Sequence, residues 1–209
     1  MTITDSGRPG KIVCVGRNYS EHARELGNEV PKEPLIFLKP PSSVIGEGAA
    51  IVLPPQSSQV EYEGEIGIVI GTRLTHAAAA NTGRAIGGIC ALNDVTARDL
   101  QKSDGQWTRA KGFDTFCPVG PEAPPPLDLE SLVVLTRVNG VERQRGLAAD
   151  MVFSIPYLLS YISGIMTLEP GDVVATGTPA GVGKLDPGDV VEIEIPGFSS
   201  VSNPVTKIV

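Results

Sequence analysis

Short apolar runs separated by Gly, Pro and Asn dominate the hydrophobic pattern of this chain, and they predict β-strands. The runs that read as strands are 11–15, 35–39, 51–53, 60–70, 90–92, 133–138, 141–145, 172–176 and 189–195. Asn139-Gly140 separates two of them and predicts a hairpin turn. Helical signals are few and short, and no strand–helix–strand alternation continues for long. We therefore expect a mainly β fold (α+β) with a few short helices.

Three segments carry helical signals. The segment from Asn18 to Gly27 reads as a short helix, with Asn18 as the expected N-cap and Gly27 as the C-cap. The Ala-rich stretch 77–86 is a second candidate. The third is 155–164, which follows Ser154 as its expected N-cap. Because this segment is apolar nearly all round, we expect it to be buried.

Glutamates alternate along the run 60–70. They are Glu61, Glu63 and Glu65. Successive side chains of a strand point to opposite faces, so the three carboxylates share one face, which Gly67 and Gly71 continue with room for a ligand. Like charges repel and burial of an unpaired carboxylate is costly, so this face is either fully solvated or neutralised by a cation. Both interpretations stay open, although Glu65 abuts an apolar run that favours burial.

Asp94, at the end of the apolar strand 90–92, is a candidate third ligand for such a cation. Carboxylates without nearby Cys or His select Mg²⁺, Mn²⁺ or Ca²⁺ over Zn²⁺. The three cysteines are Cys14, Cys90 and Cys117. They are widely spaced, so we expect them to pack in the core and form neither a disulfide framework nor a thiolate metal site.

His22 is the stronger candidate for a general base of the two histidines. It precedes Glu25 by three residues on the expected helix, which places both side chains on one face. A Glu that accepts a hydrogen bond from one imidazole nitrogen fixes the tautomer and raises basicity at the other, as activation of water requires. Lys111 lies in the polar, irregular segment 98–116 and reads as an oxyanion-binding residue or as an ordinary surface lysine.

Composition narrows the classes of partner. The net charge is -7 with a pI near 4.9 and no basic stripe, so we expect no binding to nucleic acid. The N-terminus lacks the apolar core of a signal peptide, and no apolar run approaches the roughly 18 residues of a membrane span. We therefore expect a cytoplasmic protein with no membrane partner. Its 209 residues fit one domain.

Seven strings, in this order, resemble the fumarylacetoacetate hydrolase family, and in particular its short acylpyruvase-like members. They are 15–19 with His22 and Glu25, 37–40, 63–67, 93–99, 107–113, 153–156 and 176–183. Each string is weak alone, but seven in order are specific and span nearly the whole chain. The resemblance implies a rolled mixed β-sheet around a metal, and usually a homodimer. It also implies one catalytic domain over 1–209, with a lid near 18–33 and no additional N-terminal domain.

The resemblance also implies roles for individual residues. It assigns Glu63, Glu65 and Asp94 as ligands of Mg²⁺ or Mn²⁺, with Ca²⁺ as a substitute ion. It assigns His22, Glu25 and Lys111 as catalytic residues. It places Arg98, Gln101 and Thr178 near the substrate. Glu61 is then expected to flank the site or face solvent.

The implied activity is hydrolysis of a C–C bond in small 2-oxo acids, 3-acylpyruvates such as acetylpyruvate or fumarylpyruvate. The metal would stabilise the enolate that leaves, and the His-Glu pair would activate water. The same site would support decarboxylation of oxaloacetate. Two alternatives are an isomerase or decarboxylase of 2-oxo-hydroxyhexadienedioate-type intermediates of aromatic catabolism, and a non-catalytic, metal-stabilised β scaffold that binds a ligand.

Overall fold

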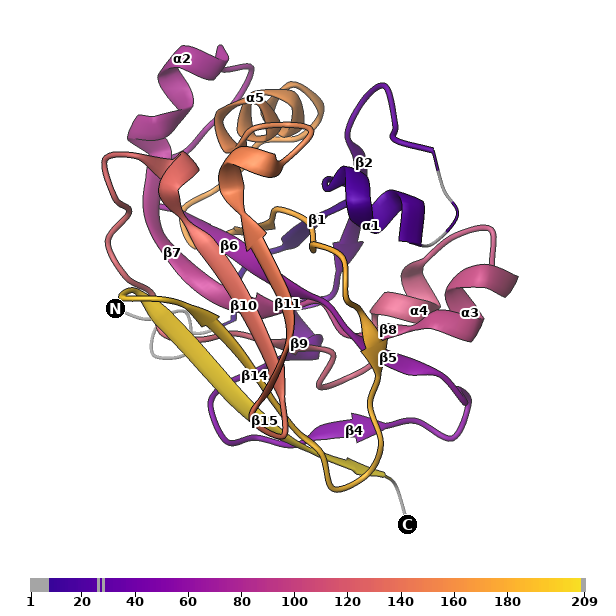
Figure 1. Ribbon diagram of the computed structural model, residues 1–209. Helices are drawn as coiled ribbons and strands as arrows, with labels where there is room; N and C mark the ends of the chain where they lie inside the picture. Colours follow the sequence, from indigo (N-terminus) through magenta and orange to yellow (C-terminus); the bar gives the residue numbers. More distant parts are fainter. Residues whose placement is uncertain (1–7, 26, 28, 208–209) are drawn as a thin grey trace.

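The computed structural model describes residues 8–25, 27 and 29–207, and its two largest sheets have five strands each (Figure 1). The first sheet has the order β2 (Leu35–Lys39), β1 (Ile12–Gly16), β12 (Val173–Ala175), β6 (Gly64–Ile70) and β7 (Ile86–Asn93). The second has the order β11 (Val141–Leu147), β10 (Val133–Val138), β14 (Val190–Ile195), β15 (Ser199–Lys207) and β4 (Ile51–Leu53). Both sheets mix parallel and antiparallel pairs, so the expectation of a mainly β fold is confirmed.

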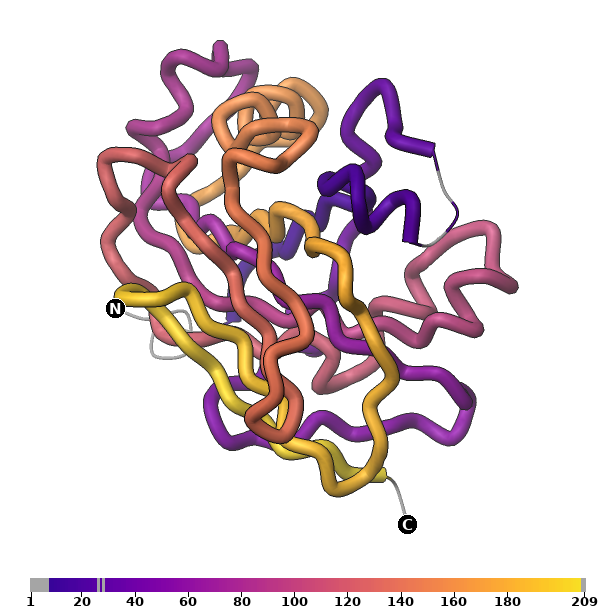
Figure 2. The backbone as a smooth tube through the Cα atoms, viewed as in Figure 1, coloured from indigo at the N-terminus to yellow at the C-terminus, as the bar shows by residue number. Residues whose placement is uncertain are grey.

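Short elements complete the described chain. The small sheets are β13 (Gly183–Lys184) with β5 (Val60–Tyr62) and β8 (Thr96–Ala97), and β3 (Val44–Ile45) with β9 (Cys117–Pro118). The helices are α1 (Ser20–Glu25), α2 (Ala79–Thr82), α3 (Arg98–Ser103), α4 (Thr108–Lys111) and α5 (Ile155–Ile165). Figure 2 shows α1 and the α3–α4 segment on the same side of the molecule. None of the described helices has the length and apolar character that crossing a bilayer needs.

Strand β6 joins the two halves of the core because it is buried on both faces. Ile66 and Ile68 belong to the large core shared with the second sheet. Val69, on the opposite face, packs in a smaller cluster that contains all three cysteines. A strand covered on both sides needs a continuous apolar run, as residues 66–70 provide. Glu65 therefore lies on a face that faces protein and not solvent.

The glutamate segment is not one long strand. Glu63 lies between β5 and β6, and this break transfers the chain from the small sheet to the first large sheet. The expected room beside the glutamates is absent at both glycines, which corrects that expectation. A Cβ on Gly67 would lie 2.6 Å from Cys90 Sγ, and one on Gly71 would lie 2.6 Å from the Cα of Gly87. These glycines permit close packing of β6 and leave no space for a ligand.

Two of the expected helix features are wrong. Asn18 does not cap α1: its side chain is buried and bonds the Phe153 and Thr176 carbonyls and the Phe153 N–H. It is a tether between the start of the lid region and the end of β12. Helix α5 is not buried all round, since Tyr157 is 43% exposed and Ile165 is 55% exposed. Only one of its faces packs on the core.

Of the expected lid, 18–33, residues 26 and 28 lie outside the described residues.

Other elements were missing from the sequence prediction. Strand β15 bonds β14 on one side and β4 on the other, yet its sequence is polar and contains Pro204. Segment 98–116, expected to be irregular, contains the short helices α3 and α4. The Asn139-Gly140 turn is confirmed, with positive φ at both residues, as a two-residue hairpin of this type requires.

At Gly64, β6 lies directly against the second sheet. A Cβ there would collide with Thr136 Oγ1 and lie 3.1 Å from Ile193 Cδ1. We expect Gly64→Ala to lower the free energy of unfolding by about 3 kcal/mol, since overpacking forces backbone shifts. Gly83→Ala is the matched control, because a Cβ there meets nothing within 4 Å and the backbone is right-handed helical. Urea unfolding should show this control unchanged or up to about 1 kcal/mol more stable. Equal stabilities of the two variants would contradict the packing at Gly64.

Candidate active site

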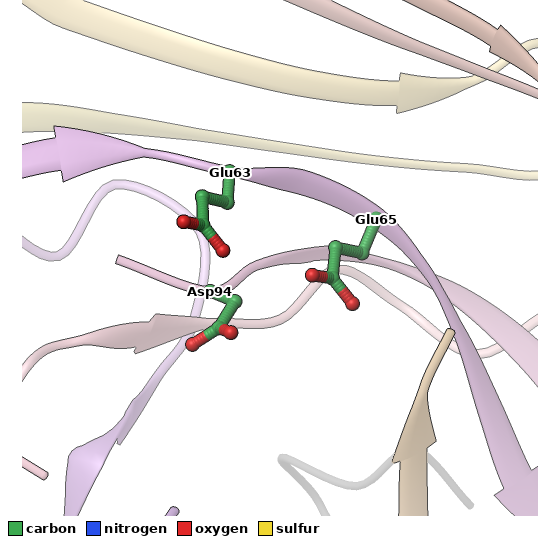
Figure 3. Close-up of side chains that lie close together, drawn as sticks. All are labelled: Glu63, Glu65 and Asp94. Atoms are coloured by element: carbon green, nitrogen blue, oxygen red, sulfur yellow. The ribbon is translucent and has the colours of Figure 1, made fainter. Parts of the chain in front are cut away.

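Three buried carboxylates converge beside the end of β7 (Figure 3). One oxygen from each of Glu63, Glu65 and Asp94 lies within 4.8 Å of the others. The antiparallel pairing of β6 with β7 places Gly64 opposite Asn93, so residues just before and after these positions meet at one place. The arrangement is thus a consequence of strand register. Each of the three residues is at most 5% exposed.

Hydrogen bonds hold the backbone at Glu63 and Asp94 and the carboxylate of Glu65. The Glu63 N–H donates to Asn93 Oδ1 at 3.0 Å, and the Asp94 N–H donates to the Glu63 carbonyl at 2.9 Å. Glu65 Oε2 accepts from the Gly177 N–H at 2.8 Å, at the end of β12. The cluster therefore rests on strands and their ends, which hold it more rigidly than a surface loop would.

Three buried basic side chains surround the carboxylates. Lys111 Nζ lies 2.8 Å from Glu63 Oε2 and 2.7 Å from Asp94 Oδ2. Lys39 Nζ lies 2.6 Å from Asp94 Oδ1. Arg98 donates to Glu63 and, from Nε, to Glu61 Oε2 at 2.7 Å. Lys111 is thus not a surface lysine, and it is only 1% exposed.

Of the two places expected for Glu61, the structure shows the first: it flanks the site and does not face solvent. It is buried against Arg98 and also accepts a bond from Gln59 Nε2 at 2.6 Å. Lys39 received no role from the sequence, although its place between apolar strand residues and Pro40 was a signal for a buried lysine. Both residues belong to the charge network without lining the cavity itself.

The surrounding charges shift the pKa values of Glu63 and Glu65 in opposite directions. Burial alone would raise the pKa of Glu63, but Lys111 and Arg98 hold it below its usual range. Burial raises the pKa of Glu65 well above its usual range, and Asp94 and Glu63 add to the rise. Burial would lower the pKa of Lys111, yet Asp94 and Glu63 raise it, so the ammonium stays charged. One of the carboxylates is therefore left without its own counter-charge.

The donor set fits a hard divalent cation. Among the residues that the structure describes, four buried carboxylates, Glu61 included, face three buried basic groups, which leaves one negative charge in excess when all of them are ionised. Burial of an unpaired charge is costly, and a cation among the three converging oxygens removes that cost. All-oxygen donors suit Mg²⁺, Mn²⁺ or Ca²⁺. The residues able to hold the ion are Glu63, Glu65 and Asp94.

Helix α1 brings a histidine to the same cavity. His22 is 4% exposed and lines the cavity with the carboxylates. Its Nδ1 lies 3.4 Å from Glu25 Oε2, and both oxygens of Glu25 accept from the Gly181 N–H at 3.1 Å. Burial lowers the pKa of His22 below its usual range, and nearby Glu63 opposes this only in part. His22 is therefore neutral at pH 7, as a general base must be.

Eight of the nine site residues expected from the sequence line one small cavity of about 40 Å³. Glu25, the ninth, does not line it but contacts His22. Sequence reasoning missed the walls formed by Arg17, Phe37 and Trp107. The strings that carried the family resemblance contain these three residues, but nothing in residue type or spacing distinguished them. A cavity of this size has room for only a few water molecules, so a larger ligand needs its walls to move.

Two of the expected substrate contacts already have protein partners. Gln101 Oε1 accepts from Arg98 Nη1 at 2.6 Å. Thr178 Oγ1 donates to the Gly64 carbonyl at 2.9 Å and accepts from Gln144 Nε2 at 2.8 Å. Gln144, on β11 of the second sheet, therefore orients the Thr178 hydroxyl. The second sheet thus holds the part of the cavity wall that Thr178 forms.

Known proteins resemble this chain along most of its length. The family model described as fumarylacetoacetate (FAA) hydrolase C-terminal matches residues 11–206. The mitochondrial oxaloacetate tautomerase FAHD1 of Arabidopsis thaliana is 46% identical over 205 residues, 95% of this chain and 92% of that protein. The human protein of the same name is 42% identical over 202 residues, 94% of this chain and 91% of that protein.

A solved structure shares the fold. The 5-carboxymethyl-2-hydroxymuconate delta-isomerase of Mycobacterium smegmatis superimposes with a TM-score of 0.89 at 44% identity, covering 96% of this chain and 80% of that one. The family match over nearly the whole chain and the relatives above 40% identity agree with each other. This chain belongs to the fumarylacetoacetate hydrolase family.

Proposed function

We propose that this protein is a divalent-metal-dependent enzyme that moves a proton on the carbon next to the keto group of a small 2-oxo acid. The observation that carries the proposal is the placement of a neutral, buried His22 on the same cavity as three converging carboxylates. The relatives named oxaloacetate tautomerase and delta-isomerase support catalysis over a non-catalytic ligand-binding scaffold.

The charge of the site selects the substrate class. Glu63, Glu65 and Asp94 would hold Mg²⁺ or Mn²⁺, which when bound supplies Lewis-acid stabilisation of negative charge on the keto oxygen. The excess negative charge of the network then becomes an excess positive charge, which favours a carboxylate-bearing ligand. Lys111 uses two of its three N–H donors on Glu63 and Asp94, which leaves one donor for a substrate oxygen.

We assign the proton transfer to His22. Glu25, an acceptor, lies beside Nδ1, so we assign the ring proton to Nδ1 and the free lone pair to Nε2. Nε2 would take a proton from the substrate carbon next to the keto group and return it during conversion between keto and enol forms. The Gly181 N–H holds Glu25 in place for this role. We propose oxaloacetate, or a similar 2-oxo acid, as the substrate, since two relatives are named oxaloacetate tautomerase.

A second candidate reaction is hydrolysis of a 3-acylpyruvate, and the His22–Glu25 contact is the observation that favours it. In that reaction His22 would deprotonate a water, whose oxygen forms a bond to the distal carbonyl carbon. The bond between that carbon and its neighbour in the pyruvate portion then breaks. A proton completes pyruvate as it leaves, and the acyl group becomes a carboxylic acid. Decarboxylation of oxaloacetate needs no water nucleophile and would use the same cavity.

Turnover with Mg²⁺ tests the proposal and separates the reactions. Pure protein should accelerate the loss of enol-oxaloacetate absorbance, measured against the uncatalysed rate. Release of pyruvate from acetylpyruvate or fumarylpyruvate, measured with a coupled assay, would establish hydrolysis. Release of CO₂ from oxaloacetate would establish decarboxylation. If none of these substrates, nor a hexadienedioate-type 2-oxo acid, is turned over, the proposed function is wrong.

Glu65→Gln and His22→Gln should separate the two roles. Calorimetry should show that Glu65→Gln weakens Mg²⁺ binding by at least about 100-fold, because it removes a charged ligand of a buried site. His22→Gln should leave metal affinity nearly unchanged but lower kcat by roughly 10²–10⁴-fold. His76→Gln, at the other and exposed histidine, is the control and should match the wild type. An equal loss of metal in the first two variants would refute the assigned roles.

Lys111→Met should destabilise the metal-free protein and enlarge the stabilisation that a bound metal gives. Without metal, two buried carboxylates lose a counter-charge, so the free energy of unfolding should fall by about 3–5 kcal/mol. With Mg²⁺ or Mn²⁺ the ion replaces that charge, so the metal-induced rise in Tm should exceed that of the wild type. Lys184→Met is the control, because Lys184 is exposed and pairs with Asp186 at the surface. A smaller metal-induced rise in the Lys111 variant would mean that Lys111 helps to hold the ion.

A further inference from the structure

Arg17 is the cationic wall residue that the proposed chemistry does not use. It follows β1 directly and lines the cavity together with His22 and the carboxylates. In the described part of the chain its guanidinium has no hydrogen bond and no carboxylate partner. It is half-buried, whereas the other arginine and the lysine of the cavity wall are buried.

The other cations near the site are already committed to protein carboxylates. Arg98 bonds Glu61 and Glu63, and Lys111 bonds Glu63 and Asp94. Lys39 bonds Asp94. A ligand anion at Arg98 or Lys39 would compete with a buried ion pair, and the one donor that Lys111 keeps free serves the 2-oxo acid end of the substrate in the proposed function. Arg17 offers its donors to a ligand without that competition, and a guanidinium can bind a carboxylate through two parallel hydrogen bonds.

The backbone holds Arg17 in a conformation that its residue type does not favour. Its φ is 59°, in the left-handed region that Gly and Asn adopt more readily. The residue after it restrains this turn, because Asn18 is tethered to the end of β12 and to Phe153. The residue before it packs closely, since a Cβ on Gly16 would lie 3.1 Å from the Trp107 ring. An arginine in this conformation at a cavity wall indicates a functional constraint on its side chain.

We propose that Arg17 binds a second carboxylate of the substrate, so that the site takes 2-oxo dicarboxylates in preference to 2-oxo monocarboxylates. This inference rests on the proposed function, in which the 2-oxo acid end of the substrate lies at Glu63, Glu65 and Asp94. One end of the substrate meets the carboxylate cluster and its ion, and the other end meets Arg17. The distance between the two carboxylates of the preferred substrate then reports the distance from the cluster to the Arg17 guanidinium.

Binding of non-reacting 2-oxo acids to the Mg²⁺-loaded full chain tests this without any need for turnover. The probes are 2-oxoglutarate and 2-oxoadipate, paired with 2-oxopentanoate and 2-oxohexanoate, which have the same carbon numbers but no distal carboxylate. Isothermal calorimetry should give a dicarboxylate at least about 10-fold tighter binding than its monocarboxylate partner, which corresponds to about 1.4 kcal/mol. The dicarboxylate that binds more tightly, 2-oxoglutarate or 2-oxoadipate, indicates how far the Arg17 guanidinium lies from the carboxylate cluster.

Variants of Arg17 should remove this discrimination. In Arg17→Met the ratio of the two dissociation constants should fall toward one, and Arg17→Lys should retain part of it. Arg17→Asn keeps a side chain that tolerates positive φ, so it separates loss of the cation from strain in the backbone. Arg24→Met is the matched control, because Arg24 is a nearby exposed arginine that does not line this cavity. It should leave the ratio unchanged.

The outcomes are distinct. If wild-type protein binds the paired acids within about twofold of each other at both lengths, or if the ratio survives in both Arg17→Met and Arg17→Asn, the proposal is wrong. A ratio lost equally in Arg24→Met would mean that overall charge, and not contact with Arg17, sets the preference, which also overturns it. A ratio that depends on Arg17 in a protein that turns over no 2-oxo acid would uphold this binding role and refute the proposed function instead.

Discussion

The buried excess of carboxylates over basic groups is the constraint on which the rest of the site depends. Glu63 and Asp94 share the Lys111 ammonium, and the remaining basic side chains bind one or two carboxylates each. Within the described part of the chain, Glu65 accepts a hydrogen bond from one backbone N–H and has no basic partner, and burial without a counter-charge raises its pKa. A divalent ion that completes this balance would add stability as well as reactivity, because its binding energy would also contribute to folding.

The two large sheets support this network in different ways. The first provides the carboxylates at the ends of β6 and β7, where register alone brings Glu63 and Asp94 together. The second reaches the site through Gln144, which bonds Thr178 and the Gly64 N–H. Gly64 has no side chain, so this contact between sheets is close. The candidate site on the first sheet is therefore coupled to packing on the second.

The sequence predicted the parts of the fold that depend on local patterns. The apolar run after Glu65 predicted a buried strand, and Asn139-Gly140 predicted a hairpin turn, because burial on both faces and positive φ each restrict residue type locally. The prediction failed where tertiary contacts dominate. Strand β15 is polar along much of its length and is a strand because β14 and β4 bond both its edges. Asn18 has a suitable residue type for a cap, yet distant carbonyls bind its side chain.

The same division holds for the site. By itself the sequence made Glu61, Glu63 and Glu65, together with Asp94, candidates for a cation and His22 a partner for Glu25, because both inferences depend on spacing along one or two elements. The family resemblance, and not the spacing, reduced the expected ligands to Glu63, Glu65 and Asp94. Only the tertiary structure decided that Glu61 is neutralised by Arg98, that Lys39 and Lys111 are buried, and that Arg17 has no carboxylate partner in the described chain. These are properties of side chains from separate elements that meet in a low-dielectric interior, and charge balance there depends on distance in space, not on separation in sequence.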